Sequence, residues 1–150
     1  MTPKALILAA LLGLAPLAAG AAETGVTHIP VSPRPGMAAA PPFSGAVRAG
    51  DTVYLSGTTD GGAALGGTPA DAAKRVLDNL KRTAESAGVT MDDLVWVQVF
   101  SSDLADYAVF NEVYRTYFKG PLPTRAYLGV DHLLGGARFE VMGIAVRRGK

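Results

Sequence analysis

Hydrophobic and polar positions along the chain repeat with a helical period in two segments. A first helix is predicted to begin at Thr68-Pro69-Ala70-Asp71, which combines an N-cap hydroxyl with a proline at the first helical position. Its apolar stripe ends before Gly88 and consists of Ala73, Val76, Leu77, Leu80 and Ala84. A second helix is predicted to begin at Asp103 or Asp106, with an apolar stripe of Phe110, Val113, Tyr114 and Tyr117.

Other segments have the pattern of β-strands. Residues 46–48 and 52–56 predict a hairpin around Ala49-Gly50-Asp51, and residues 57–67 are interpreted as a glycine-rich loop. Residues 94–100 predict a buried strand, and two further strands are expected to begin at Arg125 and Arg138. The order ββαβαββ predicts an α+β domain with a mixed sheet and two helices packed on one face.

Two of the expected strands are apolar on both faces. In the first, alternation separates Leu94, Trp96 and Phe100 from Val95, Val97 and Val99. In the second, it separates Glu140, Met142, Ile144 and Val146 from Phe139, Val141, Gly143 and Ala145. Two helices can cover only one face of such a sheet, so we expect another subunit to bury the other face.

One charged residue opens an otherwise apolar strand. Arg125 follows the breakers Pro121 and Pro123, and alternation places it on one face with Tyr127 and Gly129. A guanidinium matches a carboxylate through two parallel hydrogen bonds, which makes Arg125 a candidate anchor for a small carboxylic acid. The alternative is a structural ion pair with a neighbouring Asp or Glu, and Arg125 taken alone favours that alternative.

Short motifs around Arg125 and upstream of it place the chain among known proteins. The C-terminal motifs are Pro123-Thr124-Arg125, a turn with Leu133-Leu134-Gly135-Gly136, and Glu140-Val141 running to Ile144-Ala145-Val146-Arg147. The upstream motifs are Pro42-Phe43-Ser44-Gly45, Ala49-Gly50-Asp51 running to Ser56-Gly57, Val76-Leu77-Asp78-Asn79-Leu80, Asp92-Asp93-Leu94-Val95, and Phe110-Asn111-Glu112-Val113-Tyr114. Together they resemble the Rid family (YjgF-type, reactive intermediate deaminases), with the C-terminal motifs resembling its closing hairpin.

The resemblance implies a chorismate-mutase-like fold, assembled as a homotrimer with its sheets around a central axis and pockets between neighbouring subunits. It implies hydrolysis of reactive 2-imino acids or enamines to 2-oxo acids and ammonia, without a cofactor or a metal. The arginine matching Arg125 clamps the substrate carboxylate, and the glutamate matching Glu140 orients the attacking water. Ser56 and Gly57 match residues whose backbone lines the pocket, and Asn111 matches an asparagine near it. A salt bridge from Glu140 to Arg125 or Arg138 is the structural alternative.

The chain departs from the family pattern inside the expected pocket. Phe43 stands where active members commonly have tyrosine, and Ala126 and Tyr127 stand where they usually have small residues such as serine and cysteine. Thr58 replaces a frequent glutamine, and the loop that follows is shorter than usual. Phe43 and Tyr127 therefore join the expected substrate-binding set. These changes leave two alternatives open: a non-catalytic module that binds small carboxylates, and a chaperone-like interaction protein.

Other catalytic classes find little support in the sequence. The chain has no cysteine and no G-x-S-x-G motif, which argues against a nucleophilic hydrolase. The two histidines, His28 and His132, are too far apart for metal-ligand spacing.

The N-terminal segment predicts export. Lys4, an apolar run over residues 5–17 and Ala19-Gly20-Ala21 form the pattern of a signal peptide cleaved near Ala21, with no stable membrane anchor. Residues 22–42 are rich in proline and predict an extended arm, and residues 43–150 a single domain. Cleavage would lower the formal net charge from +1 to zero, which argues against nucleic acid as a partner. We expect a periplasmic or secreted protein.

Overall fold

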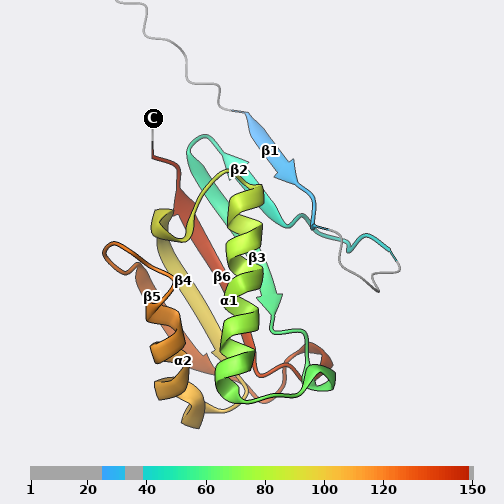
Figure 1. The fold of residues 1–150 in the computed structure, drawn as a ribbon. Helices are drawn as coiled ribbons and strands as arrows, with labels where there is room; N and C mark the ends of the chain where they lie inside the picture. The colour runs from blue at the N-terminus through green and yellow to red at the C-terminus, as the bar shows by residue number, and fades with distance from the viewer. Residues whose placement is uncertain (1–24, 33–38, 149–150) are drawn as a thin grey trace, which may run out of the picture.

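The computed structural model describes residues 25–32 and 39–148, in which one mixed sheet carries two helices on the same face (Figure 1). The strands are β1 (Val26–Ile29), β2 (Ala46–Ala49), β3 (Thr52–Thr59), β4 (Leu94–Ser101), β5 (Thr124–Gly129) and β6 (Phe139–Val146). The helices are α1 (Pro69–Ser86) and α2 (Tyr107–Arg115). The predicted α+β class is confirmed, whereas the predicted signal peptide lies outside the described residues.

The strand order β1-β2-β3-β6-β4-β5 corrects two expectations. The predicted closing hairpin is wrong, because β6 lies between β3 and β4, while β5 pairs in parallel with the other edge of β4. The arm over residues 22–42 is also not wholly irregular, since β1 pairs antiparallel with β2. Val26–Ile29 precedes the first proline of the arm, Pro30, so every residue of β1 keeps the backbone N–H that a ladder requires.

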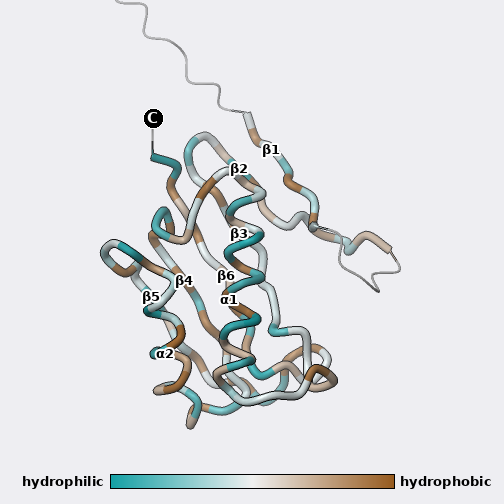
Figure 2. The backbone as a smooth tube through the Cα atoms, in the orientation of Figure 1, coloured by the Kyte–Doolittle hydropathy of each residue, from teal (hydrophilic) through white to brown (hydrophobic). Residues whose placement is uncertain are grey.

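Both helices begin close to the predicted positions. Thr68 and Asp71 form a capping box, in which Thr68 N donates to Asp71 Oδ2 at 2.8 Å and Asp71 N donates to Thr68 Oγ1 at 3.2 Å. Asp103 caps a short 3₁₀ turn, Leu104–Asp106, and α2 follows directly after it. The predicted stripes pack against the core, except that Tyr117 lies beyond the end of α2 and its hydroxyl donates to Asp78 of α1. Figure 2 shows hydrophobic and hydrophilic residues alternating around α1. No helix among the described residues is long and apolar enough to cross a membrane.

The core lies between the helices and one face of the sheet. Its fully buried members include Val53, Val97, Val99 and Val141 from the strands and Val76, Leu77, Leu80 and Phe110 from the helices. The predicted faces of β4 are wrong at its first two residues. A register shift between Leu94 and Trp96 turns Leu94 into the core at 5% exposure and leaves Val95 46% exposed.

The other face of the sheet, called the open face below, has no covering element within the described residues. Cross-strand pairing places Tyr54, Ile144 and Trp96 side by side, with Met142 beside Gln98 in the next row. Tyr54 and Val146 also lie on this face, and they remain 49% and 41% exposed. Exposure of such large apolar side chains on one face is unusual for a monomer. A large apolar face of this kind is a typical subunit interface.

A buried carboxylate fixes the end of β3 against the start of β6. Asp60 is 2% exposed and accepts hydrogen bonds from the backbone N–H groups of Gly62 at 2.9 Å, Arg138 at 2.8 Å and Phe139 at 3.1 Å. Asp60 N in turn donates to Phe139 O at 3.2 Å. Glu140, which follows Phe139 on β6, is therefore held in register opposite Thr59.

We predict that Asp60→Asn lowers the free energy of unfolding by about 3 kcal/mol. Both carboxylate oxygens of Asp60 now accept backbone N–H groups, and the NH₂ group of an asparagine would face one of these donors without an acceptor. Asp103→Asn is the matched control. Asp103 also accepts a backbone N–H, from Ala105, but it is exposed, and asparagine caps equally well. Urea denaturation of both variants measures the difference, and equal losses would show that Asp60 has no special role.

Candidate active site

The predicted site residues fall into two groups on opposite faces of the sheet. Arg125 and Tyr127 pair across the ladder with Val97 and Val99, which are buried beneath the helices. Adjacent paired residues point to the same face, so both side chains lie on the helix side. Glu140 follows the buried residue Phe139 on β6 and precedes Val141, so it points to the opposite face. The sheet itself separates Arg125 from Glu140 within one chain.

The first group, called the arginine cluster, consists of Arg125, Tyr127 and Asn111 together with aromatic residues of α2. Arg125 Nη2 donates to Asn111 Oδ1 at 2.6 Å. The guanidinium carbon lies 4.6 Å from the ring centroid of Tyr114 and 5.7 Å from that of Tyr127. These contacts hold the charged group in place by cation–π attraction.

Arg125 has no carboxylate partner among the described residues, so the ion pair considered as its alternative is not found there. Its positive charge is held by a neutral amide and by rings, neither of which neutralises it. Because Asn111 uses its oxygen to accept from Arg125, its NH₂ group is left to donate elsewhere. Arg125, Asn111 and Tyr114 line a cavity of about 230 Å³. This cavity therefore presents donors and positive charge, which suit a small anion.

Tyr114 belongs to this cluster although the sequence indicated only a core position for it. The residue is 3% exposed, and its hydroxyl has no hydrogen-bond partner within the described part of the chain. Burial raises the pKa of Tyr114 to about 12, so the hydroxyl stays protonated at neutral pH. A buried hydroxyl normally has a partner. One feature of the sequence indicated this role: Tyr114 places a polar hydroxyl inside an otherwise apolar helix stripe.

Tyr127 does not line the cavity beside Arg125. Its ring makes edge contacts with Tyr107 at 5.0 Å and with Phe110 at 5.5 Å between centroids. Burial also raises the pKa of its hydroxyl. The ring therefore belongs to the aromatic packing between β5 and α2 and supports Arg125 from one side.

The second group, called the glutamate cluster, consists of Glu140, Ser56, Gly57 and Phe43. A β-bulge interrupts the pairing of β3 with β6 at Ser56 and Gly57, since Leu55 pairs with Gly143 and Thr58 with Val141. The bulge brings Gly57 so close to Glu140 that a Cβ atom at Gly57 would collide with Oε1 of Glu140. Glycine is required here for close approach to the carboxylate.

Ser56 holds the neighbouring segment in place through both of its donors. Its hydroxyl donates to Ser44 O at 2.6 Å, and its backbone N–H donates to Gly45 O at 3.0 Å. These bonds position Phe43, whose ring is 55% exposed, beside Ser56 and Gly57 at the wall of a cavity of about 450 Å³. Glu140 lines the same cavity.

Glu140 forms no hydrogen bond or ion pair with any residue that the structure describes. Arg138, one expected partner, instead pairs with Asp106, and Arg125 lies on the opposite face. The salt bridge considered as the alternative for Glu140 is therefore not found. An unpaired, half-buried carboxylate beside a cavity can orient a water molecule and accept its proton.

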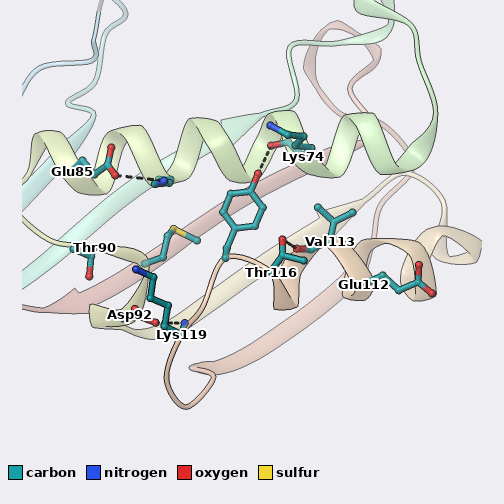
Figure 3. Close-up of a pocket in the computed structure, with 11 residues that line it drawn as sticks. Lys74, Glu85, Thr90, Asp92, Glu112, Val113, Thr116 and Lys119 are labelled. Carbon is teal, nitrogen blue, oxygen red and sulfur yellow. Dashed lines mark hydrogen bonds and ion pairs between the residues drawn. The ribbon is translucent and has the colours of Figure 1, made fainter.

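Each chain thus carries its predicted site residues in two separate groups rather than in one pocket. A further groove of about 710 Å³ lies between α1 and α2, with Lys74 and Glu85 on α1 and Glu112 on α2 (Figure 3). It contains none of the predicted site residues, and Lys74 is already paired with Asp78 at 2.6 Å. No group of three or more His, Cys, Asp or Glu in residues 25–32 and 39–148 is arranged to hold a metal ion.

Known proteins resemble this chain in both sequence and structure. The mouse protein named 2-iminobutanoate/2-iminopropanoate deaminase is 37% identical over 114 residues, which cover 73% of this chain and 84% of the mouse protein. A deaminase of the same name from Dermatophagoides farinae is 34% identical and covers 81% of this chain and 94% of its own length.

Solved structures show the same fold. RidA from the Antarctic bacterium Psychrobacter has a TM-score of 0.65 at 35% identity, covering 73% of this chain and 91% of its own. Escherichia coli TdcF, solved with bound serine, has a TM-score of 0.67 at 32% identity with the same coverages. The family described as Endoribonuclease L-PSP matches residues 34–147. From this match and these relatives, the chain belongs to the Rid (YjgF, L-PSP) family.

Proposed function

We propose that the protein hydrolyses reactive 2-imino acids, and related enamines, to 2-oxo acids and ammonia without a cofactor. The observation that carries the proposal is a pair of unneutralised side chains, Arg125 and Glu140, each facing a cavity. The relatives named as 2-iminobutanoate/2-iminopropanoate deaminases support this reaction type. A small carboxylate that carries an imine uses both groups at once.

The active assembly is a homotrimer in which one subunit contributes the arginine cluster and its neighbour contributes the glutamate cluster. Two observations support it. The open face leaves a large apolar surface without cover, and the two clusters lie on opposite faces of one sheet. Rotational symmetry presents different faces of neighbouring subunits to each other, so half-sites that are separate in one chain can meet between two chains.

In this composite site Arg125 forms two hydrogen bonds to the substrate carboxylate, and the Asn111 NH₂ group donates a further one. The carbon of the imine, whose nitrogen is protonated, then lies next to a water molecule held by Glu140. Glu140 accepts a proton as the water oxygen bonds to that carbon, and passes this proton to the nitrogen of the resulting carbinolamine. As the C–N bond breaks and ammonia leaves, Glu140 accepts the remaining hydroxyl proton, which forms the 2-oxo acid, and then releases that proton to ammonia or solvent. An iminium carbon is already electrophilic, so positioning and one base supply the catalysis.

Carboxylate binding without turnover remains the second candidate, because Phe43 supplies no hydroxyl to the glutamate cluster. The packing of Tyr127 favours the catalytic candidate, since its ring lies against α2 and does not line the cavity beside Arg125. The family description names an endoribonuclease, but no histidine lines either half-site cavity. The cavity of about 230 Å³ with two arginines, Arg115 and Arg125, suits a small acid better than a polyanion.

We predict that Arg125→Lys and Glu140→Gln impair the protein in different ways. The assay is ammonia release from an imine generated in situ by an amino-acid oxidase, with binding of a 2-oxo acid measured by calorimetry. Arg125→Lys loses the bidentate contact, so both binding and turnover should fall at least about tenfold. Glu140→Gln removes the base, so turnover should fall at least about a hundredfold with nearly unchanged binding. If both variants bind and react at wild-type rates, the site assignment is wrong. If the unmodified protein binds 2-oxo acids but shows no turnover, the binding module is favoured.

We predict that Gly57→Ala abolishes most turnover while the protein stays folded. The added methyl group has to displace the Glu140 carboxylate, which is the flexible end of a side chain. Gly25→Ala is the matched control, because a Cβ atom at Gly25 meets nothing within 4 Å. Circular dichroism checks the fold of both variants. An active Gly57→Ala variant would mean that the position of Glu140 against Gly57 is unimportant for the reaction.

We predict that the protein is a trimer in solution, because burial of the open face stabilises the assembly. Light scattering at micromolar concentration gives the mass directly. Tyr54→Lys places a charge on the open face and should weaken the assembly, whereas Lys74→Glu, on the outer surface of α1, should not. A stable, soluble wild-type monomer would contradict the composite site.

A further inference from the structure

We infer that the preferred substrate carries an uncharged, apolar side chain of about four non-hydrogen atoms or more, of the leucine, methionine or phenylalanine type. This inference rests on the proposed function, since it names the substrate class of the same site. It goes beyond the small one- and two-carbon side chains that the names of the deaminase relatives suggest.

Four apolar side chains, those of Val31, Pro41, Phe43 and Leu134, line the glutamate cavity beside the hydroxyls of Ser56, Thr58, Thr59 and Thr83. Within the described part of the chain, Glu140 alone contributes an ionisable side chain to this lining. An acidic substrate side chain would be repelled by Glu140, and a cationic one would pair with Glu140 and neutralise the base. An uncharged apolar side chain avoids both effects and gains from the apolar walls.

Leu134 is the most informative wall residue because it is 84% exposed in the chain. It begins the 3₁₀ turn Leu134–Gly136, which packs against the turn Ala63–Leu65 and the glycine before it. A Cβ atom at Gly62 would lie 2.6 Å from Gly135 O, and both glycines have positive φ, 93° and 65°. The close glycine contact fixes the turn and holds the leucine at the rim of the cavity.

Phe43 forms a second exposed apolar wall and is also held from behind. Ser44 O accepts from the Ser56 hydroxyl, and the Ser44 hydroxyl lies 3.1 Å from His28 Nδ1 on β1. Gly45 N donates to Ile29 O at 2.8 Å. The ring is thus fixed on a short segment between two strands while more than half of its surface is open.

The cavity also has room for a long side chain. Its volume of about 450 Å³ lies within the range of about 300–1,000 Å³ that is usual for small-molecule pockets. The neighbouring subunit takes up part of that space in the proposed assembly. A two-carbon side chain placed next to Glu140 would still leave Phe43 and Leu134 largely uncovered, whereas a leucine or phenylalanine side chain would reach them.

The test compares imines that an amino-acid oxidase generates from alanine, leucine, methionine, phenylalanine and glutamate. The protein under test is kept at a low concentration, so that its hydrolysis step limits the measured rate. Each additional buried methylene should raise the specificity constant about fourfold. We expect the leucine, methionine and phenylalanine imines to react at least about tenfold faster than the alanine imine, and the glutamate imine to react slowest.

Two variants and a control assign the preference to the walls. Leu134→Ser and Phe43→Ser should each cut the leucine-over-alanine ratio at least about threefold while the alanine imine is still hydrolysed. Leu104→Ser, at another exposed leucine that does not line the cavity, should keep the wild-type ratio.

The outcomes separate this inference from the proposed function. If no imine is hydrolysed, the proposed function fails and the inference with it. If the alanine imine reacts as fast as the leucine imine, or if Leu134→Ser keeps the full ratio, the function stands and the inference is wrong. If Leu134→Ser instead dissociates the assembly in light scattering, a neighbouring subunit covers this leucine, which also overturns the inference.

Discussion

The apolar character of both sheet faces is the constraint on which the rest of the structure depends. On one face, α1 and α2 bury the side chains of Val97, Val99 and Val141. On the other, Tyr54, Trp96 and Ile144 form rows that no element of the described chain covers. Both α-helices of the described chain pack on the first face, so an assembly is the simplest way to remove the second face from water. The same sheet divides the candidate site, because its two charged groups extend from opposite faces.

Two local structural features give the glutamate cluster and the arginine cluster their geometry. At the glutamate cluster, the bulge at Gly57 and the buried Asp60 carboxylate fix β3 and β6 on either side of Glu140. At the arginine cluster, Asn111 and the rings of α2 surround Arg125 without neutralising it. Each feature keeps an ionisable side chain free for a ligand. A structural ion pair would do the opposite, and neither residue forms one within the described chain.

Local patterns predicted the elements better than their arrangement. The capping residues Thr68 and Asp71 and the apolar stripe of α1 act within a few turns of helix, so the sequence alone located that helix. The insertion of β6 between β3 and β4 depends on pairing between distant segments, and no local pattern indicates it. The bulge at Leu94 and Val95 reverses the alternation by one residue, so a strict period of two assigned both residues to the wrong face.

The candidate site was predictable in part for the same reason. Motif resemblance identified Arg125, Asn111, Glu140 and Gly57, because each residue lies in a short recognisable run. It gave no indication of Tyr114, whose contact with Arg125 arises only when α2 packs on β5. Nor did it show that Leu134 lines the cavity beside Glu140, since that position depends on contact between two glycine turns.

Subunit complementation tests the composite site most directly. Arg125→Ala and Glu140→Gln chains, each nearly inactive alone, are unfolded, mixed in equal amounts and refolded together. If a site takes its arginine from one subunit and its glutamate from another, about a quarter of the sites in random mixed assemblies contain both wild-type residues. The account predicts recovery of about a quarter of wild-type turnover in the mixture. Activity no higher than the average of the two separate variants would contradict it.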